Sequence, residues 1–150
     1  MNQTAIFWPM LAHVLLVFIV YVVLAVRRRA SIVTGEAKIQ QFKVRHEEPA
    51  SSVTAANNIM NQFELPILFH VVVICLFVTT CVTYVTLTLA WLFAALRYAH
   101  AYVHLTSNKL KWRNMTFRTG LLVLFVLWVV FALHLAGLHP AGGQQVRDAV

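Results

Sequence analysis

Long uncharged apolar segments constrain this sequence more than any other feature. Residues 6–26 contain no Lys, Arg, Asp or Glu and are long enough to cross a bilayer as one helix. Residues 65–96 are also uncharged, but a single helix over them would extend about 48 Å, beyond a hydrocarbon core of about 30 Å. We interpret this stretch as the centre of a helical hairpin that turns at about residues 79–86, where Thr and Tyr side chains can satisfy loosened backbone groups.

A last apolar segment completes the pattern. Residues 118–138 form a further span, which Gly137, Pro140 and the pair Gly142-Gly143 bring to an end. The sequence therefore predicts an all-α membrane protein, a four-transmembrane-helix bundle in a single domain over residues 1–150. The expected helices cover about residues 6–26, 54–80, 84–105 and 118–138, and a disordered tail is expected at about residues 140–150.

The charge of the chain follows its apolar segments. Only 11% of the residues are charged, whereas soluble domains carry about 25%. The net charge of +7 would suit nucleic acid, but ten of the twelve Lys and Arg lie in or beside two loops, at residues 27–45 and 109–118. These positions suit anionic lipid headgroups, so we expect membrane lipid, and no nucleic acid, as a partner. The positive-inside rule places both loops in the cytoplasm and both termini outside it.

The second expected span begins with a polar helical face. Asn57, Asn61 and Glu64 recur at helical spacing. An ionisable residue such as Glu64, at the edge of the hydrocarbon, is costly unless it is paired, which makes it a candidate for a functional site. Pro66 cannot donate a hydrogen bond to the carbonyl of Gln62, so the helix is loosened beside Glu64. The alternative role for Glu64 is a structural ion pair between two helices.

The third expected span ends with a second polar face. Arg97, His100 and His104 share one side of a helix, and Tyr102 flanks them on the adjacent side. The start of the second span and the end of the third lie at the same depth in a hairpin. We therefore expect an ion pair between Glu64 and Arg97.

The groups at this end of the expected bundle suggest a basic pocket. Arg113, expected in a loop over residues 106–117, would fold over the helix ends. Such a pocket suits an anionic, water-soluble ligand that meets a lipophilic one, and a nearby Arg would favour the thiolate form of a thiol. His100 and His104 also have the spacing of a metal-binding pair, with Glu64 as a third ligand, but such a pair is a weak signal and we predict no metal site. Polar packing at a subunit interface is the remaining alternative.

Three further histidines lie within the expected spans. His13 and His134 are single polar groups in apolar surroundings, where a hydrogen bond between helices is the favoured role. His70 follows Glu64 along the second span and is close enough to join its site.

Two motifs in these spans resemble those of a known family. The segment Asn-Asn-Ile-Met-Asn-Gln-Phe-Glu-Leu-Pro at residues 57–66 resembles the helix-two motif of the MAPEG family, the membrane-associated proteins of eicosanoid and glutathione metabolism. Arg97-x-x-His100-x-x-x-His104, followed nine residues later by Arg113, resembles that family's helix-three motif. Chain length, four spans and a large first cytoplasmic loop match as well. The resemblance implies a four-helix bundle assembled as a homotrimer, of a bacterial type and hence in a bacterial inner membrane.

The resemblance also implies a glutathione site between neighbouring subunits. In the glutathione-using members, residues of helix two from one subunit and helix three from the other hold the peptide. Arg113 falls on the arginine that is held to stabilise the thiolate, so it is the candidate catalytic residue. The candidate residues for binding glutathione, as co-substrate, are Asn57, Asn61, Glu64, Arg97, His100, Tyr102 and His104.

The chain departs from the enzymes of this family at three positions. Asn57 stands where an arginine is usual, and Met60 stands where a basic residue is common. His104 replaces the helix-three tyrosine, although Tyr102 is close by. Without an arginine at position 57, a carboxylate of glutathione loses a bidentate partner.

Two functions follow from the residues and the resemblance together. The first is a membrane-bound glutathione-dependent transferase or peroxidase that conjugates or reduces a lipophilic electrophile. The second is a non-catalytic or differently liganded relative that keeps the trimer but lacks thiol activation. Glutathione binding to the purified protein separates the two.

Overall fold

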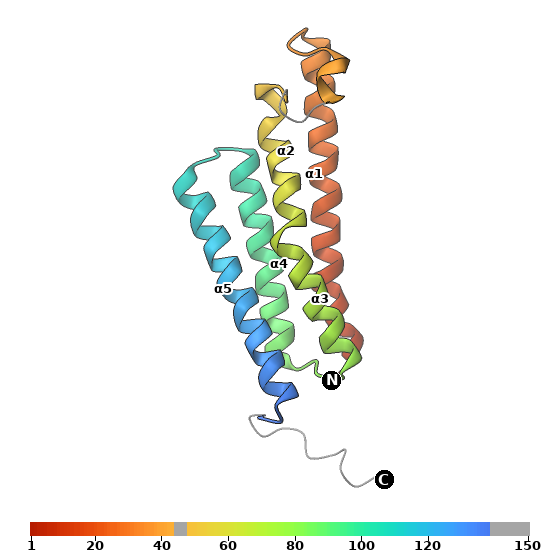
Figure 1. Ribbon diagram of the computed structural model, residues 1–150, viewed down its shortest axis with the longest axis vertical. Helices are drawn as coiled ribbons and strands as arrows, with labels where there is room; N and C mark the ends of the chain where they lie inside the picture. Colours follow the sequence, from red (N-terminus) through yellow and green to blue (C-terminus); the bar gives the residue numbers. More distant parts are fainter. Residues whose placement is uncertain (44–47, 139–150) are drawn as a thin grey trace.

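The computed structural model describes residues 1–43 and 48–138, and most of these residues form helices (Figure 1). The disordered tail expected at about residues 140–150 lies outside the described residues. The elements of the described chain are η1 (Gln3–Ile6), α1 (Phe7–Val33), η2 (Ile39–Lys43), α2 (Ala50–Phe63), α3 (Leu65–Val78), α4 (Tyr84–Leu105) and α5 (Leu110–Leu135).

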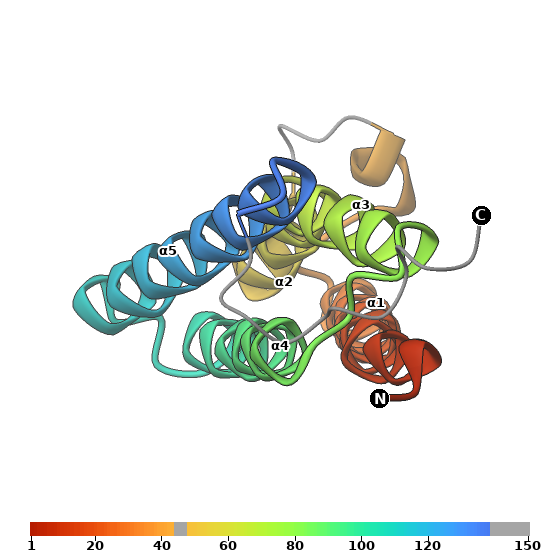
Figure 2. The same cartoon turned by 90° about the horizontal axis from the view of Figure 1, so that it is seen from below.

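The helices stand side by side, with α2 and α3 following one another along a single bent rod (Figure 1). The N-terminus, the turn between α3 and α4, and the end of α5 lie at one end of the bundle, which we term the N-terminal end. The other end, termed the η2 end, carries η2 and the start of α2. Helix α4 packs against α1, α2 and α5, and the view along the bundle shows α5 on the side of α4 away from α1 (Figure 2).

A bend at Glu64 separates α2 from α3. Its backbone angles, φ −88° and ψ −93°, are not helical, and Pro66 lies in the first turn of α3. Because proline lacks an N–H and its ring crowds the preceding turn, the single helix expected over residues 54–80 is two helices. The last carbonyls of α2 are therefore left for other donors.

Two helices extend further than the sequence suggested. Helix α1 runs on through the three arginines at residues 27–29 to Val33, and it ends just before Gly35, whose φ of 75° lies in the left-handed region. Helix α5 begins at Leu110, so the loop expected over residues 106–117 is wrong and Arg113 lies in the first turn of α5. Lys and Arg are good helix formers, so the charges that end a membrane span do not end a helix.

The turn between α3 and α4 falls within the range that the sequence indicated. Helix α3 ends at Val78 and α4 begins at Tyr84. Thr80 takes a left-handed φ of 54°. Thr83 and Thr86 exchange hydrogen bonds as a capping box at the start of α4. Threonine hydroxyl groups thus stabilise this turn, which contains no glycine or proline.

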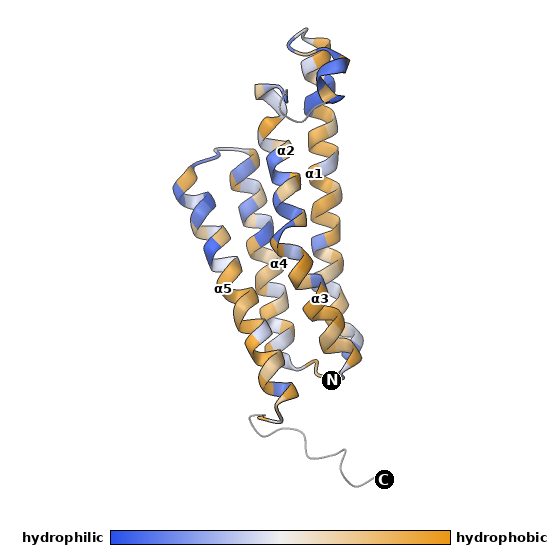
Figure 3. Ribbon diagram, viewed as in Figure 1, coloured by the Kyte–Doolittle hydropathy of each residue, from blue (hydrophilic) through white to orange (hydrophobic). Residues whose placement is uncertain are grey.

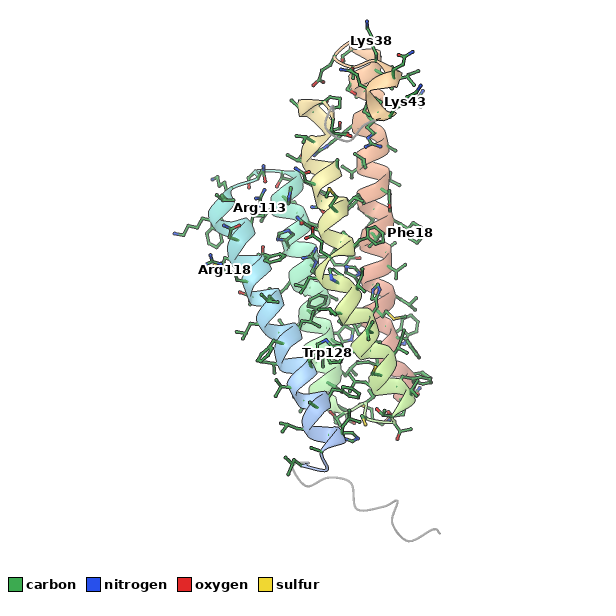
Figure 4. All side chains as sticks on the ribbon, in the orientation of Figure 1. Phe18, Lys38, Lys43, Arg113, Arg118 and Trp128 are labelled. Carbon is green, nitrogen blue, oxygen red and sulfur yellow. The ribbon has the colours of Figure 1, made fainter. Side chains whose placement is uncertain are left out.

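Three stretches of the described chain are long and apolar enough to cross a membrane, namely Gln3–Val33, Ala50–Val78 and Leu110–Leu135. Figure 3 shows apolar residues along most of α1, α3 and the lower part of α5. Large apolar side chains such as Phe18 project outward from these helices (Figure 4). The chain is therefore an integral membrane protein.

Buried polar side chains lie between two apolar clusters inside the bundle. The larger cluster includes Phe69 and Phe93, whose rings stack at 4.5 Å. The smaller one contains Leu16, Val20 and Ala101. The buried side chains that we call the polar layer are His13, Asn58, Gln62, Arg97, His100 and His104. Since buried polar groups are almost always hydrogen-bonded, this layer is the natural place to look for a site.

Candidate functional site

Arg97 lies inside the bundle with 1% of its surface exposed. Its Nη2 donates to the carbonyl oxygen of Asn61 at 2.8 Å and to Oε1 of Gln62 at 3.1 Å. The bend at Glu64 frees that carbonyl at the end of α2, and the C-terminal end of a helix dipole stabilises a cation. The bent helix therefore holds the guanidinium of Arg97 through its last turn.

The ion pair expected between Glu64 and Arg97 is not a direct contact in the described chain, although the Glu64 charge is close enough to act on Arg97 electrostatically. The one ion pair among the described residues joins Arg28 to Glu48, and Glu64 is exposed. Glu64 occupies the bend itself, with non-helical backbone angles, while Arg97 is served by groups from the preceding turn. The hydrogen-bond partners of Arg97 are thus an amide and a carbonyl.

A hydrogen-bonded chain that the sequence patterns did not predict starts at Arg97 and crosses the polar layer. Oε1 of Gln62 lies 3.1 Å from Nε2 of His13, and Nδ1 of His13 lies 3.2 Å from Nε2 of His70. Gln62 also donates to Oδ1 of Asn58 at 2.8 Å. His13 does bond across helices, as expected, whereas His70 pairs with His13 and not with Glu64. The missed signal was the spacing of Asn58 and Gln62, four residues apart on one helical face.

The two histidines of α4 are buried and incompletely bonded. Nδ1 of His100 lies 3.2 Å from the carbonyl oxygen of Arg113 and 3.3 Å from Oγ1 of Thr116. Within the described chain, four buried side-chain nitrogens have no hydrogen-bond partner: Arg97 Nε, His100 Nε2, His104 Nδ1 and Trp128 Nε1. The first three belong to residues on one face of α4, which places three unpaired nitrogens along its C-terminal half.

Arg113 meets this face through its backbone. Its carbonyl oxygen is the group near His100, while its guanidinium Nη1 donates to Oδ1 of Asn108 at 3.0 Å. Figure 4 shows Arg113 near the start of α5, on the side toward α4, and Arg118 further along the helix. Arg113 is half-buried, so its side chain lies at the edge of the polar layer.

The structure does not bring all of the predicted site residues together. Asn57, Glu64 and Tyr102 are exposed, whereas Arg97, His100 and His104 are buried. The side chain of Asn61 is half-buried, and its contact with Arg97 is made by the backbone carbonyl. In one chain, therefore, Arg97, His100 and His104 face inward, whereas Tyr102 on the same helix faces outward, as Asn57 and Glu64 do.

No group of three or more His, Cys, Asp or Glu side chains in the described residues is placed to hold a metal ion. In particular, Glu64 is exposed on α2 while His100 and His104 are buried on α4. The arrangement weighed above, with Glu64 as third ligand, is not formed in this chain.

Two arginines of α1 fasten the η2 end of the bundle. Arg27 donates to the hydroxyl of Thr54 at 2.7 Å and to the carbonyl of Leu105 at 2.6 Å. Arg28 forms two hydrogen bonds with the carboxylate of Glu48, at 2.9 and 2.6 Å. The Arg28 guanidinium lowers the pKa of Glu48 below its usual value. These two basic residues are thus structural, because their hydrogen bonds hold α2 and α4 against α1.

These features define a helical membrane protein with a buried basic layer near one end, lined by unpaired nitrogens. The chain belongs to the MAPEG family, whose family model matches residues 5–133. No curated protein and no solved structure gives a significant match. Family membership makes this a membrane protein of the glutathione and eicosanoid class.

Proposed function

We propose that the protein is a membrane-bound glutathione-dependent transferase or peroxidase that acts on a lipophilic electrophile. The observation that carries this proposal is the row of unpaired nitrogens on Arg97, His100 and His104. A buried polar group without a partner costs about 1–3 kcal/mol. An anionic ligand that inserted between α4 and its neighbouring helices would offer acceptors to these groups, and glutathione has two carboxylates and a thiol that can ionise.

The same proposal includes a homotrimer with four spans per chain. Asn57, Glu64 and Tyr102 are exposed in a single chain, and a neighbouring copy would bring an α2 face of this kind against α4. Helix α4 would serve as the fourth span because its Arg97 and histidines are buried and its large apolar side chains, such as Trp91 and Leu92, are exposed. Native mass spectrometry in mild detergent should find three chains, and only monomers or dimers would contradict the assembly.

Arg113 would act on the thiol. Its guanidinium is hydrogen-bonded to Asn108 at the edge of the polar layer. The backbone carbonyl of Arg113 contacts His100. An arginine stays charged and can approach a sulfur anion without losing its proton. In the proposed mechanism Arg113 favours thiolate over thiol, which raises the concentration of the nucleophile.

Conjugation of a hydrophobic aryl halide tests this role. Arg113→Ala should reduce turnover far more than glutathione affinity, since the group acts mainly on the reacting atom. Lys109→Ala and Lys111→Ala remove a charge from the same helix end and are the matched controls, with much smaller effects expected. Equal losses in all three variants would mean that bulk charge acts, and the specific role of Arg113 would fail.

The alternative, a relative without thiol activation, is favoured by two observations. The guanidinium of Arg113 already has a partner in Asn108, and Asn57 supplies an amide where the family's enzymes have an arginine. Calorimetric titration of detergent-purified protein with glutathione separates the two functions. Micromolar binding supports the transferase, whereas millimolar or no binding supports the alternative.

A further inference from the structure

Arg97 sets the direction of the hydrogen bonds in the polar layer. A guanidinium has donors only, so the Gln62 atom that lies 3.1 Å from Nη2 of Arg97 is the amide oxygen. The same oxygen lies 3.1 Å from Nε2 of His13, which must therefore carry a proton and donate. The amide nitrogen of Gln62 donates to Asn58 at 2.8 Å, as this orientation requires.

The direction continues to His70. Both histidines lie in the apolar part of the bundle, and His13 also lies near the buried Arg97. A charged imidazole is costly there, so each is neutral and has one N–H. With its proton on Nε2, His13 offers a bare Nδ1. Nε2 of His70 lies 3.2 Å from that atom and is the donor. His70 is then left with an unprotonated Nδ1, a hydrogen-bond acceptor at the far end of the chain from Arg97.

This acceptor is accessible at the surface of α3. No hydrogen bond within the described residues reaches Nδ1 of His70. Unlike the unpaired nitrogens of His100 and His104, it is not sealed inside the protein. His70 is half-buried, and Ile67, Val71 and Ile74 beside it are exposed apolar side chains on the uncharged helix α3. The hydrocarbon around such a helix has no water to satisfy the atom.

We propose that Nδ1 of His70 is a binding site for the hydroxyl group of a lipophilic alcohol or phenol that enters from the bilayer. The hydroxyl donates to Nδ1, and the apolar body lies over Ile67, Val71 and Ile74. A lipophile that lacks a donor, such as an ether, gains nothing from this atom. The site goes beyond the proposed glutathione function, and it requires that this face of α3 stays open to lipid in the assembled protein.

Gln62 ties this acceptor to the buried arginine. The amide oxygen of Gln62 accepts from both Arg97 and His13, so the orientation of that amide decides which nitrogen of His13 is bare. Gln62→Glu keeps an acceptor in the same place and should preserve the tautomers of both histidines. Gln62→Leu removes it and should let His13 exchange between its two neutral forms.

The test uses ¹⁵N-histidine NMR of the protein in lipid nanodiscs, with 2-naphthol and its methyl ether, 2-methoxynaphthalene, as probes. In the free protein, Nε2 of both histidines should be protonated and Nδ1 bare. Titration with 2-naphthol should move the Nδ1 resonance of His70 saturably toward its hydrogen-bonded position, and the methyl ether should not. By naphthol fluorescence, His70→Phe should weaken saturable binding by on the order of tenfold, the worth of one hydrogen bond.

Val78→Phe is the matched control, because it enlarges an exposed apolar side chain at the end of α3, outside the proposed site, and leaves the acceptor in place. It should retain the affinity of the wild type. Protonated Nδ1 in free His70, equal shifts with both probes, or no shift with either would overturn the proposal. Since no glutathione is present in these measurements, a negative result leaves the proposed function standing, and a failure of glutathione binding leaves the His70 site standing.

Discussion

Gln62 is the residue on which the polar layer depends. Its side chain joins Arg97, His13 and Asn58. Gln62→Leu would remove the acceptor that Arg97 and His13 share, and each buried hydrogen bond left unmade costs about 1–3 kcal/mol. We expect a large fall in the Tm of the detergent-purified protein for this variant, and a smaller one for Gln62→Glu, which retains the acceptor. Equal, small losses in both variants would show that the layer does not contribute to stability.

Gln62 also shows which part of the site the sequence does not predict. Two pairs of amides on α2 have the same spacing, Asn57 with Asn61 and Asn58 with Gln62. The two faces are offset by one residue, and neither period nor composition says which of them turns inward. The structure buries Asn58 and Gln62 and exposes Asn57. On α4 only one polar face was available, so the grouping of Arg97 with its two histidines was readable from spacing.

At the scale of elements, Arg27 of α1 connects this helix to α2 and α4 by hydrogen bonds. It bonds Thr54 on one helix and the carbonyl of Leu105 on another. Arg29 is exposed on the same segment and carries the same charge. Arg27→Ala should lower the free energy of unfolding by about 1–3 kcal/mol, and Arg29→Ala should leave it nearly unchanged. Denaturant titration in micelles measures both free energies of unfolding. Equal losses in the two variants would mean that these arginines act through their overall charge and not through the hydrogen bonds of Arg27.

The pair Arg28–Glu48 makes the attachment of α2 sensitive to acid. Glu48 accepts from Arg28 and from the hydroxyl of Ser52, and its pKa is lowered chiefly by the hydrogen bond from Arg28. Because the folded pKa lies below the unfolded one, the stabilisation is complete above the usual pKa of a glutamate. It is lost as the pH falls through the lowered value. The Tm of the wild type should therefore drop more steeply below about pH 4.3 than that of Glu48→Gln.

Glu36→Gln is the control for this pH dependence. Glu36 is exposed and accepts only a 3.3 Å hydrogen bond from the backbone of Ser51. The Tm of the Glu36→Gln variant should change with pH in the same way as the Tm of the wild type. If Glu48→Gln also follows the wild type, the Arg28–Glu48 pair does not stabilise the fold.

Helix bounds differed from expectation for a related reason. In the sequence, the charge run at residues 27–29 favours the end of a helix, and the basic residues at 109–113 favour a loop over residues 106–117. Both lie within helices, α1 and α5. Charge marks where a chain leaves the hydrocarbon, whereas a helix ends where capping groups or a left-handed residue such as Gly35 end it.

At the scale of the whole molecule, apolar run lengths were enough to predict a helical membrane protein with its hairpin turn near residue 80. Assembly is different, since the sequence offers only exposed polar faces that need partners. Side chains such as Asn57 and Tyr102, exposed in one chain, take their role from a neighbour that a single sequence does not contain.

The orientation of the bundle is the last prediction. The η2 end carries Lys38 and Lys43 at its tip, and Arg113 lies in the half of the bundle nearer to it (Figure 4). The turn between α3 and α4 lies at the opposite end (Figure 1) and has no Lys or Arg. By the positive-inside rule, the η2 end faces the cytoplasm and the N-terminal end faces outward.

Thiol labelling of intact cells with a membrane-impermeant reagent measures this orientation. In a background in which the free Cys75 and Cys81 are changed to Ser, Thr80→Cys at the α3–α4 turn should react from outside. Gln40→Cys in η2 should react only after the cells are opened. Both residues are exposed in the structure, so a difference between them reports their side of the membrane and not their burial. Labelling of position 40 and protection of position 80 in intact cells would reverse the topology, and it would place the proposed glutathione site at the outer surface.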